Sequence, residues 1–215
     1  MADPFHFLTR FNLSVLLGRQ ARNVRTLLEG IKEVPGSCIY YHTHRFIQQH
    51  HYLSPEPPND FAFWATNALS RDALGESLAS VDTVRFNKIE SLRERFIAIL
   101  ESFLLEADGR NGDCQEGEEF HFMSCRTFIL PTAHVAGDLK EFRTILEDVT
   151  ISSIYYHVFE ARLRLEKNGN DFSNWFETIG ERDLARAVRR LDPYTMTLEG
   201  LRQKIIQLVS RHVQD

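Results

Sequence analysis

Hydrophobic and polar residues alternate near the start of the chain, as they do on a half-buried β strand. Apolar residues occupy every second position from Phe5 to Val15, with one interruption at Thr9. A second segment, Phe120 to Leu130, alternates less regularly but is rich in aromatic and β-branched residues, which favour strands. The pattern therefore predicts one strand in each half, and leaves open a hairpin that ends near Gly18.

Helical periodicity follows each predicted strand. Apolar residues recur at i, i+3, i+7 and i+10 from Val24 to Val34 and again from Leu139 to Val149. Asn23 and Asp138 precede these segments and are suitable N-caps. About four more helices are expected in each half. They begin near Ile39, Asn59, Asp72 and Asn87 in the first half and near Ile154, Asn170, Asp183 and Thr197 in the second.

The two halves also resemble each other in sequence. The block from Phe5 to Thr9 recurs 115 positions later, and so does the block from Ser37 to His42. The motif Asn59-Asp60-Phe61-x-x-Trp64 recurs 111 positions later, so the first half carries a four-residue insertion, which the Pro-rich stretch 54–58 supplies. Matching blocks in the same order predict a tandem duplication.

This pattern defines a domain organisation and a fold class. We expect repeat unit 1 at 1–105, an acidic, Gly-rich and flexible linker at 106–119, and repeat unit 2 at 120–215, with both repeats in one globule. The fold class is α+β and mostly helical, with one strand and about five helices per repeat. Because a lone strand leaves backbone groups unpaired at its edges, the two strands should pair across a pseudo-twofold axis in a small antiparallel sheet.

Composition excludes several classes of protein. The net charge is −5 and the pI is about 6.0, so neither nucleic acid nor an anionic membrane is an expected partner. The three cysteines are an odd number without a C-x-x-C pair, which favours free thiols in a reducing cytosol. The first residues lack the features of a signal peptide, and no segment is long and apolar enough to span a bilayer. A cytoplasmic location is therefore expected.

Four of the nine histidines occupy duplicated positions, where they could converge as metal ligands. Their neighbours do not keep ligand character in both halves, since His44 corresponds to Phe159 and Glu160 corresponds to Arg45. We therefore expect hydrogen-bonded structural histidines, with no metal and no cofactor. The duplicated histidines are His6, His42, His121 and His157.

Three groups of residues are candidates for binding. Paired tyrosines beside histidines could line a pocket for an organic ligand, and the insertion found only in the first half could contact a protein partner. Closely spaced arginines in the second half indicate a solvated helix face or an anion contact. The ligand candidates are Tyr40, Tyr41, His42, His44, Tyr155, Tyr156 and His157. The partner candidates are His50, His51, Pro55, Pro57 and Pro58, and the arginines are Arg182, Arg186, Arg189 and Arg190.

Sequence motifs identify a family but no activity. The chain contains no nucleophile elbow, phosphate-binding loop or zinc-protease motif, so no catalytic residue is assigned. At Tyr40–Phe46, Leu53–Phe61 and Leu191–Arg202 the chain resembles the DUF5752 group of uncharacterised bacterial and archaeal proteins. That resemblance covers nearly the whole chain except the linker, and implies no established activity or cofactor. The resemblance also implies that its relatives are encoded near carbohydrate-active enzymes.

Two functions remain after these exclusions. The leading hypothesis is a non-enzymatic interaction or regulatory protein with a protein partner. The alternative is a small-molecule binding protein or enzyme that acts on a sugar or sugar phosphate. The oligomeric state is left open.

Overall fold

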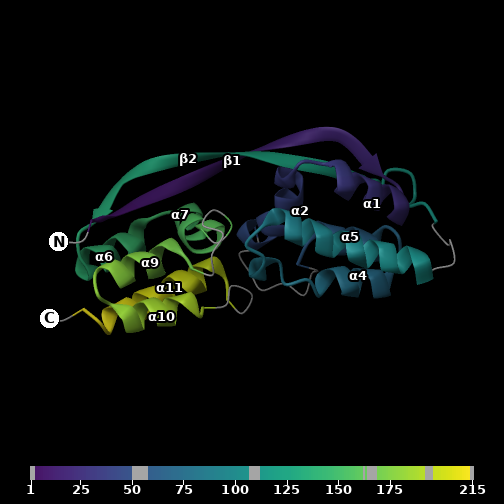
Figure 1. The fold of residues 1–215 in the computed structure, drawn as a ribbon. Helices are drawn as coiled ribbons and strands as arrows, with labels where there is room; N and C mark the ends of the chain where they lie inside the picture. The colour runs from purple at the N-terminus through teal and green to yellow at the C-terminus, as the bar shows by residue number, and fades with distance from the viewer. Residues whose placement is uncertain are drawn as a thin grey trace. The chain divides into compact units, whose positions relative to one another are not determined.

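The chain forms two long strands and two sets of helices (Figure 1). The computed structural model describes residues 3–49, 58–106, 112–161, 163, 169–191 and 196–213. Strands β1 (Phe5–Ala21) and β2 (Phe120–Ala136) pair in a two-stranded antiparallel sheet, which confirms the predicted pairing. No described helix is long and apolar enough to cross a bilayer.

Each strand is followed by its own series of helices. After β1 come α1 (Val24–Glu33), α2 (Gly36–Gln49), α3 (Asp60–Asn67), α4 (Asp72–Ala79), the short η1 (Thr83–Arg85) and α5 (Ile89–Glu106). After β2 come α6 (Leu139–Asp148), α7 (Ile151–Tyr155), the π-helical η2 (Tyr156–Glu160), α9 (Asp171–Thr178), α10 (Arg182–Arg189) and α11 (Leu198–Ser210). The α+β and mostly helical class is therefore confirmed.

The chain divides into two compact units. Among the described residues, the N-terminal unit comprises 12–49 and 58–126, and the C-terminal unit comprises 3–11 and 127–213. Each strand therefore leaves one unit and enters the other. The start of β1 packs with α6–α11, and the start of β2 packs with α1–α5. These units differ from the predicted repeats 1–105 and 120–215, because each strand begins in the unit that holds the other repeat's helices.

Aromatic side chains at the start of each strand form the centre of each core. In the C-terminal unit, the rings of Phe5 and Phe7 lie 5.6 Å and 5.2 Å from the ring of Phe142. In the N-terminal unit, the ring of Phe120 lies 5.3 Å from Phe61, and Phe122 is fully buried. Burial of such large apolar surfaces is the main force that holds each strand on its helices.

The helix starts follow the predicted capping chemistry. The side-chain oxygens of Asn23 and Asp138 accept hydrogen bonds from the backbone N–H groups of Thr26 (2.9 Å) and Glu141 (2.8 Å). Asn59 and Asn170 cap α3 and α9 in the same manner. Each cap satisfies an N–H group that the first helical turn leaves unpaired.

Three expectations differ from the structure. β1 does not end in a hairpin, because it continues through Gly18 although that residue has a φ of 71°. Residues 112–119 of the expected flexible linker are held on the N-terminal unit, where the Cys114 N–H donates to the Arg22 carbonyl (2.7 Å). Helices were expected to begin near Asp72 and Asp183, but α4 begins at Asp72 and α10 begins at Arg182, so the second start is displaced by one residue.

A close contact between α1 and β2 gives the first prediction. A Cβ atom at Gly30 would lie 2.1 Å from Cζ of the buried Phe122 ring. Gly30→Ala should therefore lower the free energy of unfolding by about 1–3 kcal/mol, as overpacked cores do. Urea denaturation measures this change. The exposed neighbour Glu29→Ala is the control and should leave the midpoint nearly unchanged; equal midpoints for both variants would contradict the contact.

Candidate functional site

His42 connects α2 to the start of β2 in the N-terminal unit. Its Nε2 accepts a hydrogen bond from the backbone N–H of Met123 (2.9 Å), so the ring proton lies on Nδ1. Nδ1 donates to the Asp60 carboxylate (2.8 Å) at the first residue of α3. The imidazole is buried, with 3% of its surface exposed. It therefore joins a strand and two helices, and both of its nitrogens are used.

His157 makes the same contacts in the C-terminal unit. Its Nε2 accepts from the backbone N–H of Leu8 (2.8 Å), and its Nδ1 donates to the Asp171 carboxylate (2.8 Å). The ring of Phe172 lies 5.4 Å from the imidazole, at an angle of 29°. We call each of these His–Asp–backbone arrangements a strand clasp. The geometry agrees with the prediction that these histidines are structural.

Tryptophan side chains hold the chain just before each strand. The Nε1–H of Trp64 donates to the carbonyl of Glu118 (2.6 Å), and that of Trp175 donates to the carbonyl of Asp3 (3.0 Å). Each indole thus fixes the backbone two residues ahead of a strand. The tryptophans of the two Asn-Asp-Phe-x-x-Trp motifs therefore act in packing and strand placement.

The other predicted ligand residues lie in or beside the two cores. Tyr40 is buried and stacks on His44 with ring centroids 5.0 Å apart, and His44 is bonded through Nδ1 to the Thr43 hydroxyl (2.8 Å). Tyr41 is half-buried, while Tyr155 and Tyr156 are buried. None of these side chains lines a described hollow. Their role in ligand binding stays a prediction, to which their burial adds no support.

A buried ion pair lies in the C-terminal unit. The Arg10 guanidinium of β1 bonds to the Glu160 carboxylate and lies 4.6 Å from the centroid of the Tyr155 ring. Glu160 ends the π-helical segment η2. A buried ion pair is expensive to dissociate, so it helps to hold β1 against η2. At this position β2 has Cys125 in place of an arginine.

The remaining histidine and partner candidates lie elsewhere. His6 and His121 are exposed, and among the described residues no group of three or more His, Cys, Asp or Glu side chains could hold a metal ion. His50, His51, Pro55 and Pro57 lie outside the described residues, whereas Pro58 is half-buried just before α3. The partner role of these residues stays a prediction.

Burial also removes Cys38 from consideration as a nucleophile. Desolvation raises the pKa of its thiol to about 12, an effect that the charge of Arg93 only partly offsets. Nucleophilic cysteines need the opposite shift, because the thiolate is the reactive form. Burial likewise raises the pKa of Cys114.

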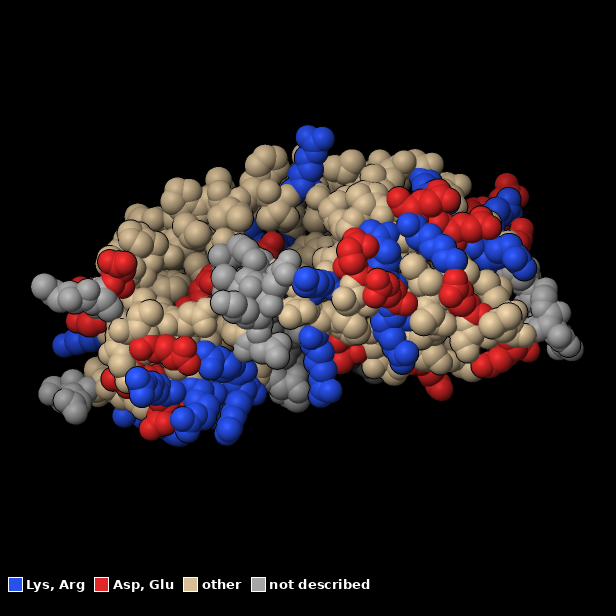
Figure 2. Space-filling model, in the orientation of Figure 1, with Lys and Arg blue, Asp and Glu red and all other residues tan. Residues whose placement is uncertain are grey.

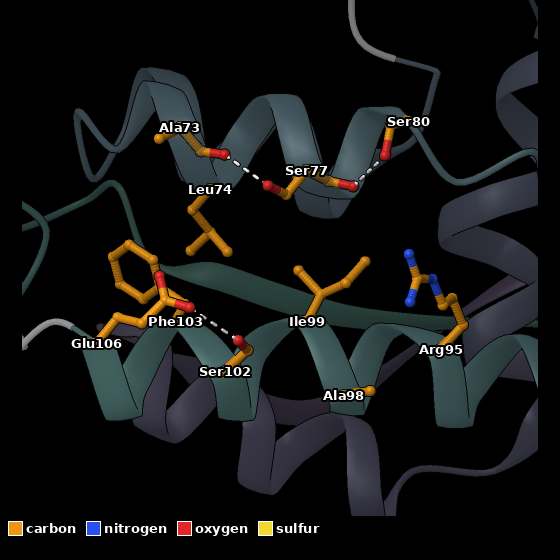
Figure 3. Close-up of a pocket in the computed structure, with 10 residues that line it drawn as sticks. All are labelled: Ala73, Leu74, Ser77, Ser80, Arg95, Ala98, Ile99, Ser102, Phe103 and Glu106. Carbon is orange, nitrogen blue, oxygen red and sulfur yellow. Dashed lines mark hydrogen bonds between the residues drawn. The ribbon is translucent and has the colours of Figure 1, made fainter.

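Each unit has an open hollow on its surface. The N-terminal hollow, about 370 Å³, lies between α4 and α5, with Leu74, Ile99 and Phe103 along its floor (Figure 3). Its serine hydroxyls already donate within their own helices, as Ser77 does to the Ala73 carbonyl (2.8 Å). The C-terminal hollow, about 420 Å³, is lined by Glu177 and three arginines of α10. It contains the predicted candidates Arg182, Arg186 and Arg189.

Comparison with known proteins places the chain in a family. The family model DUF5752, a family of unknown function, matches residues 2–210. The chain belongs to the DUF5752 family. This DUF5752 chain is also similar to the solved structure of OrfY from Thermoproteus tenax, at 29% identity and a TM-score of 0.81. That similarity covers 98% of this chain and 97% of OrfY. No curated protein matches the chain.

The strand clasps of this DUF5752 fold predict which histidines matter for stability. His42→Ala and His157→Ala each remove an acceptor from a partly buried strand N–H group and should lower the free energy of unfolding by about 1–3 kcal/mol. Thermal or urea denaturation measures the loss. His6→Ala, an exposed histidine at a duplicated position, is the control. Loss of stability no greater than in the control would show that the clasps contribute nothing.

Thiol reactivity tests the burial of Cys38. In a Cys114→Ala/Cys125→Ala variant, Cys38 should not react with a colorimetric thiol reagent at pH 8 until urea unfolds the chain. Because the folded-state pKa is about 12 and the ordinary value is 9.0, the stability that this group contributes is fully present below about pH 9. Its contribution to stability is then lost as the pH rises toward 12. Rapid labelling of the folded variant would contradict the assigned burial.

Proposed function

We propose that this protein is a non-enzymatic interaction or regulatory protein whose contact surface lies on the middle of its two strands. The observation that carries the proposal is the distribution of exposed apolar side chains. Six of the nine large apolar residues exposed in the described chain lie in two short strand segments. We call these the uncharged stretches: Phe11–Gly18 of β1 and Thr127–Ala133 of β2.

The uncharged stretches differ from ordinary exposed strands. Neither contains a charged residue. In β2, three consecutive residues, Phe128, Ile129 and Leu130, are each nearly half exposed, so apolar side chains emerge on both faces of that strand. In β1, Phe11 and Leu16 are 58% and 59% exposed. Exposed edge strands are usually protected by charges, and an apolar surface without them is typical of an interaction site.

The hydrogen-bonded histidines and the buried Cys38 support a non-enzymatic role. The histidines best placed for catalysis, His42 and His157, have both ring nitrogens in hydrogen bonds to the fold. Cys38 is buried, with its pKa raised to about 12. These groups therefore offer neither a free base nor a ready nucleophile.

The occupant that we propose is a second copy of the chain. The uncharged stretches offer no charge for a charged partner to match, and their apolar side chains complement an identical surface. Isologous contacts of this kind join most homodimers, because one patch meets itself across a twofold axis. Pro131 of β2 cannot donate a backbone hydrogen bond, so a second copy would pair poorly with the edge of β2. The second copy is therefore expected to pair with the edge of β1 or to pack against a face of the sheet.

Three Leu→Lys variants test this proposal. Leu13 and Leu130 lie in the uncharged stretches and are 50% and 48% exposed, whereas Leu105 at the end of α5 is 83% exposed. Sedimentation equilibrium should detect a wild-type dimer, and Leu13→Lys or Leu130→Lys should weaken it at least about tenfold. Leu105→Lys should leave the dimer unchanged. A monomeric wild-type protein, or equal weakening by all three variants, would overturn the assignment of this surface.

We also infer that the chain is a tandem duplication that acts in a reducing compartment such as the cytoplasm. Support for the duplication comes from the strand clasps, the tryptophan bonds and the caps of Asn59 and Asn170, since each of these features pairs residues from matching blocks of the two halves. Arg93 and Arg202 add to this support, since each donates to carbonyls at the end of the first helix after its strand. The three cysteines are free and buried, which fits a reducing compartment.

A further inference from the structure

The arginines of α10 gather on one side of the C-terminal unit (Figure 2). Arg182, Arg186 and Arg189 lie at i, i+4 and i+7, so they share a helix face. The opposite face of α10 is buried through Leu184, Ala185 and Val188. Together with Glu177 of α9, the three arginines line the open hollow of about 420 Å³.

The fold does not require these arginines. Helix α4 holds the corresponding place in the N-terminal unit, with the same length and the buried residues Leu74, Gly75 and Leu78 in the same pattern. Both helices also begin two residues after a residue with positive φ, Ser70 or Gly180. When the buried positions are aligned, the positions of Arg182 and Arg186 are occupied in α4 by Asp72 and Glu76. The two helices therefore share their packing and have opposite charge on this face.

Acidic side chains neutralise only part of this face. Glu177 accepts a hydrogen bond from Nη2 of Arg189 (2.9 Å). Asp183 lies 3.5 Å from Nη1 of Arg186, but both side chains are largely exposed, so this ion pair is weak. Arg182 has no ion pair with another described residue. The four residues that line the hollow carry three positive charges against one negative charge.

We propose that the α10 hollow is a binding site for a small anion that carries a phosphate group. Guanidinium groups suit this ligand because each presents two parallel N–H donors that match two phosphate oxygens. Arg182 and Arg186 supply the charge that Glu177 does not neutralise, and Glu177 orients Arg189 at the edge of the hollow. The buried Nε of Arg189 has no acceptor among the described residues. The site shares no residue with the uncharged stretches and does not depend on the proposed self-association.

Binding of inorganic phosphate and pyrophosphate tests the site. Isothermal titration calorimetry of the full chain, at constant ionic strength with chloride, should show saturable binding of pyrophosphate. Arg186→Gln should weaken that binding at least about tenfold. The variant Arg182→Asp/Arg186→Glu gives these two positions of α10 the residues of α4, and should fold as wild type by circular dichroism while it loses binding.

A matched control and a competing ligand complete the test. Arg126→Gln removes one exposed positive charge from β2 and should leave pyrophosphate binding unchanged. Absence of saturable binding to either anion would overturn the proposal. So would equal weakening by Arg126→Gln, which would indicate only a response to net charge. Binding of a single-stranded oligonucleotide without binding of pyrophosphate would show that the arginines recognise a polymer backbone rather than a small anion.

Discussion

Each helical unit of this protein depends on a strand whose first residues enter its core. Phe7 and Phe122 are fully buried among helices that follow the other strand in the sequence. The strand clasps fix the register of this insertion, because His157 and His42 accept hydrogen bonds from the N–H groups of Leu8 and Met123. Apolar burial supplies most of the stabilisation, while the directional hydrogen bonds select one position of the strand.

Much of this arrangement could be predicted from the sequence, since it follows from local chemistry. Alternation predicted the strands, helical periodicity predicted the helices, and the asparagines at 23, 59 and 170 predicted their starts. The recurrence of the Phe-His-Phe and Tyr-Tyr-His blocks indicated that each half places these residues at equivalent positions of the fold. The exchange of strands between units could not be predicted, because a strand's pattern shows that one face is buried but not which helices bury it. The continuation of β1 through Gly18 was missed for a similar reason: a glycine with positive φ ends some strands and lies within others.

The differences between the units are as informative as their similarities. The clasps and the Trp64 and Trp175 contacts hold their strands with the same residue types in both units. Where side chains face solvent, α4 and α10 differ in charge although their buried faces agree. Among the predicted ligand residues, His44 has no histidine counterpart in the second half, and it is buried against Tyr40. The sequence did indicate the arginines of α10 as a solvated face or an anion contact, whereas their contrast in charge with α4 required the structural alignment of the two helices.

Hydrogen exchange of individual strand amides tests the clasp account most directly. In the folded protein, the N–H protons of Leu8 and Met123 should exchange slowly, because each is bonded to a buried imidazole. His157→Ala should accelerate exchange at Leu8 and leave Met123 protected, and His42→Ala should have the reverse effect. Fast exchange at both amides in the wild-type protein, or loss of protection at both in either variant, would contradict two separate clasps that each hold one strand on its own helices.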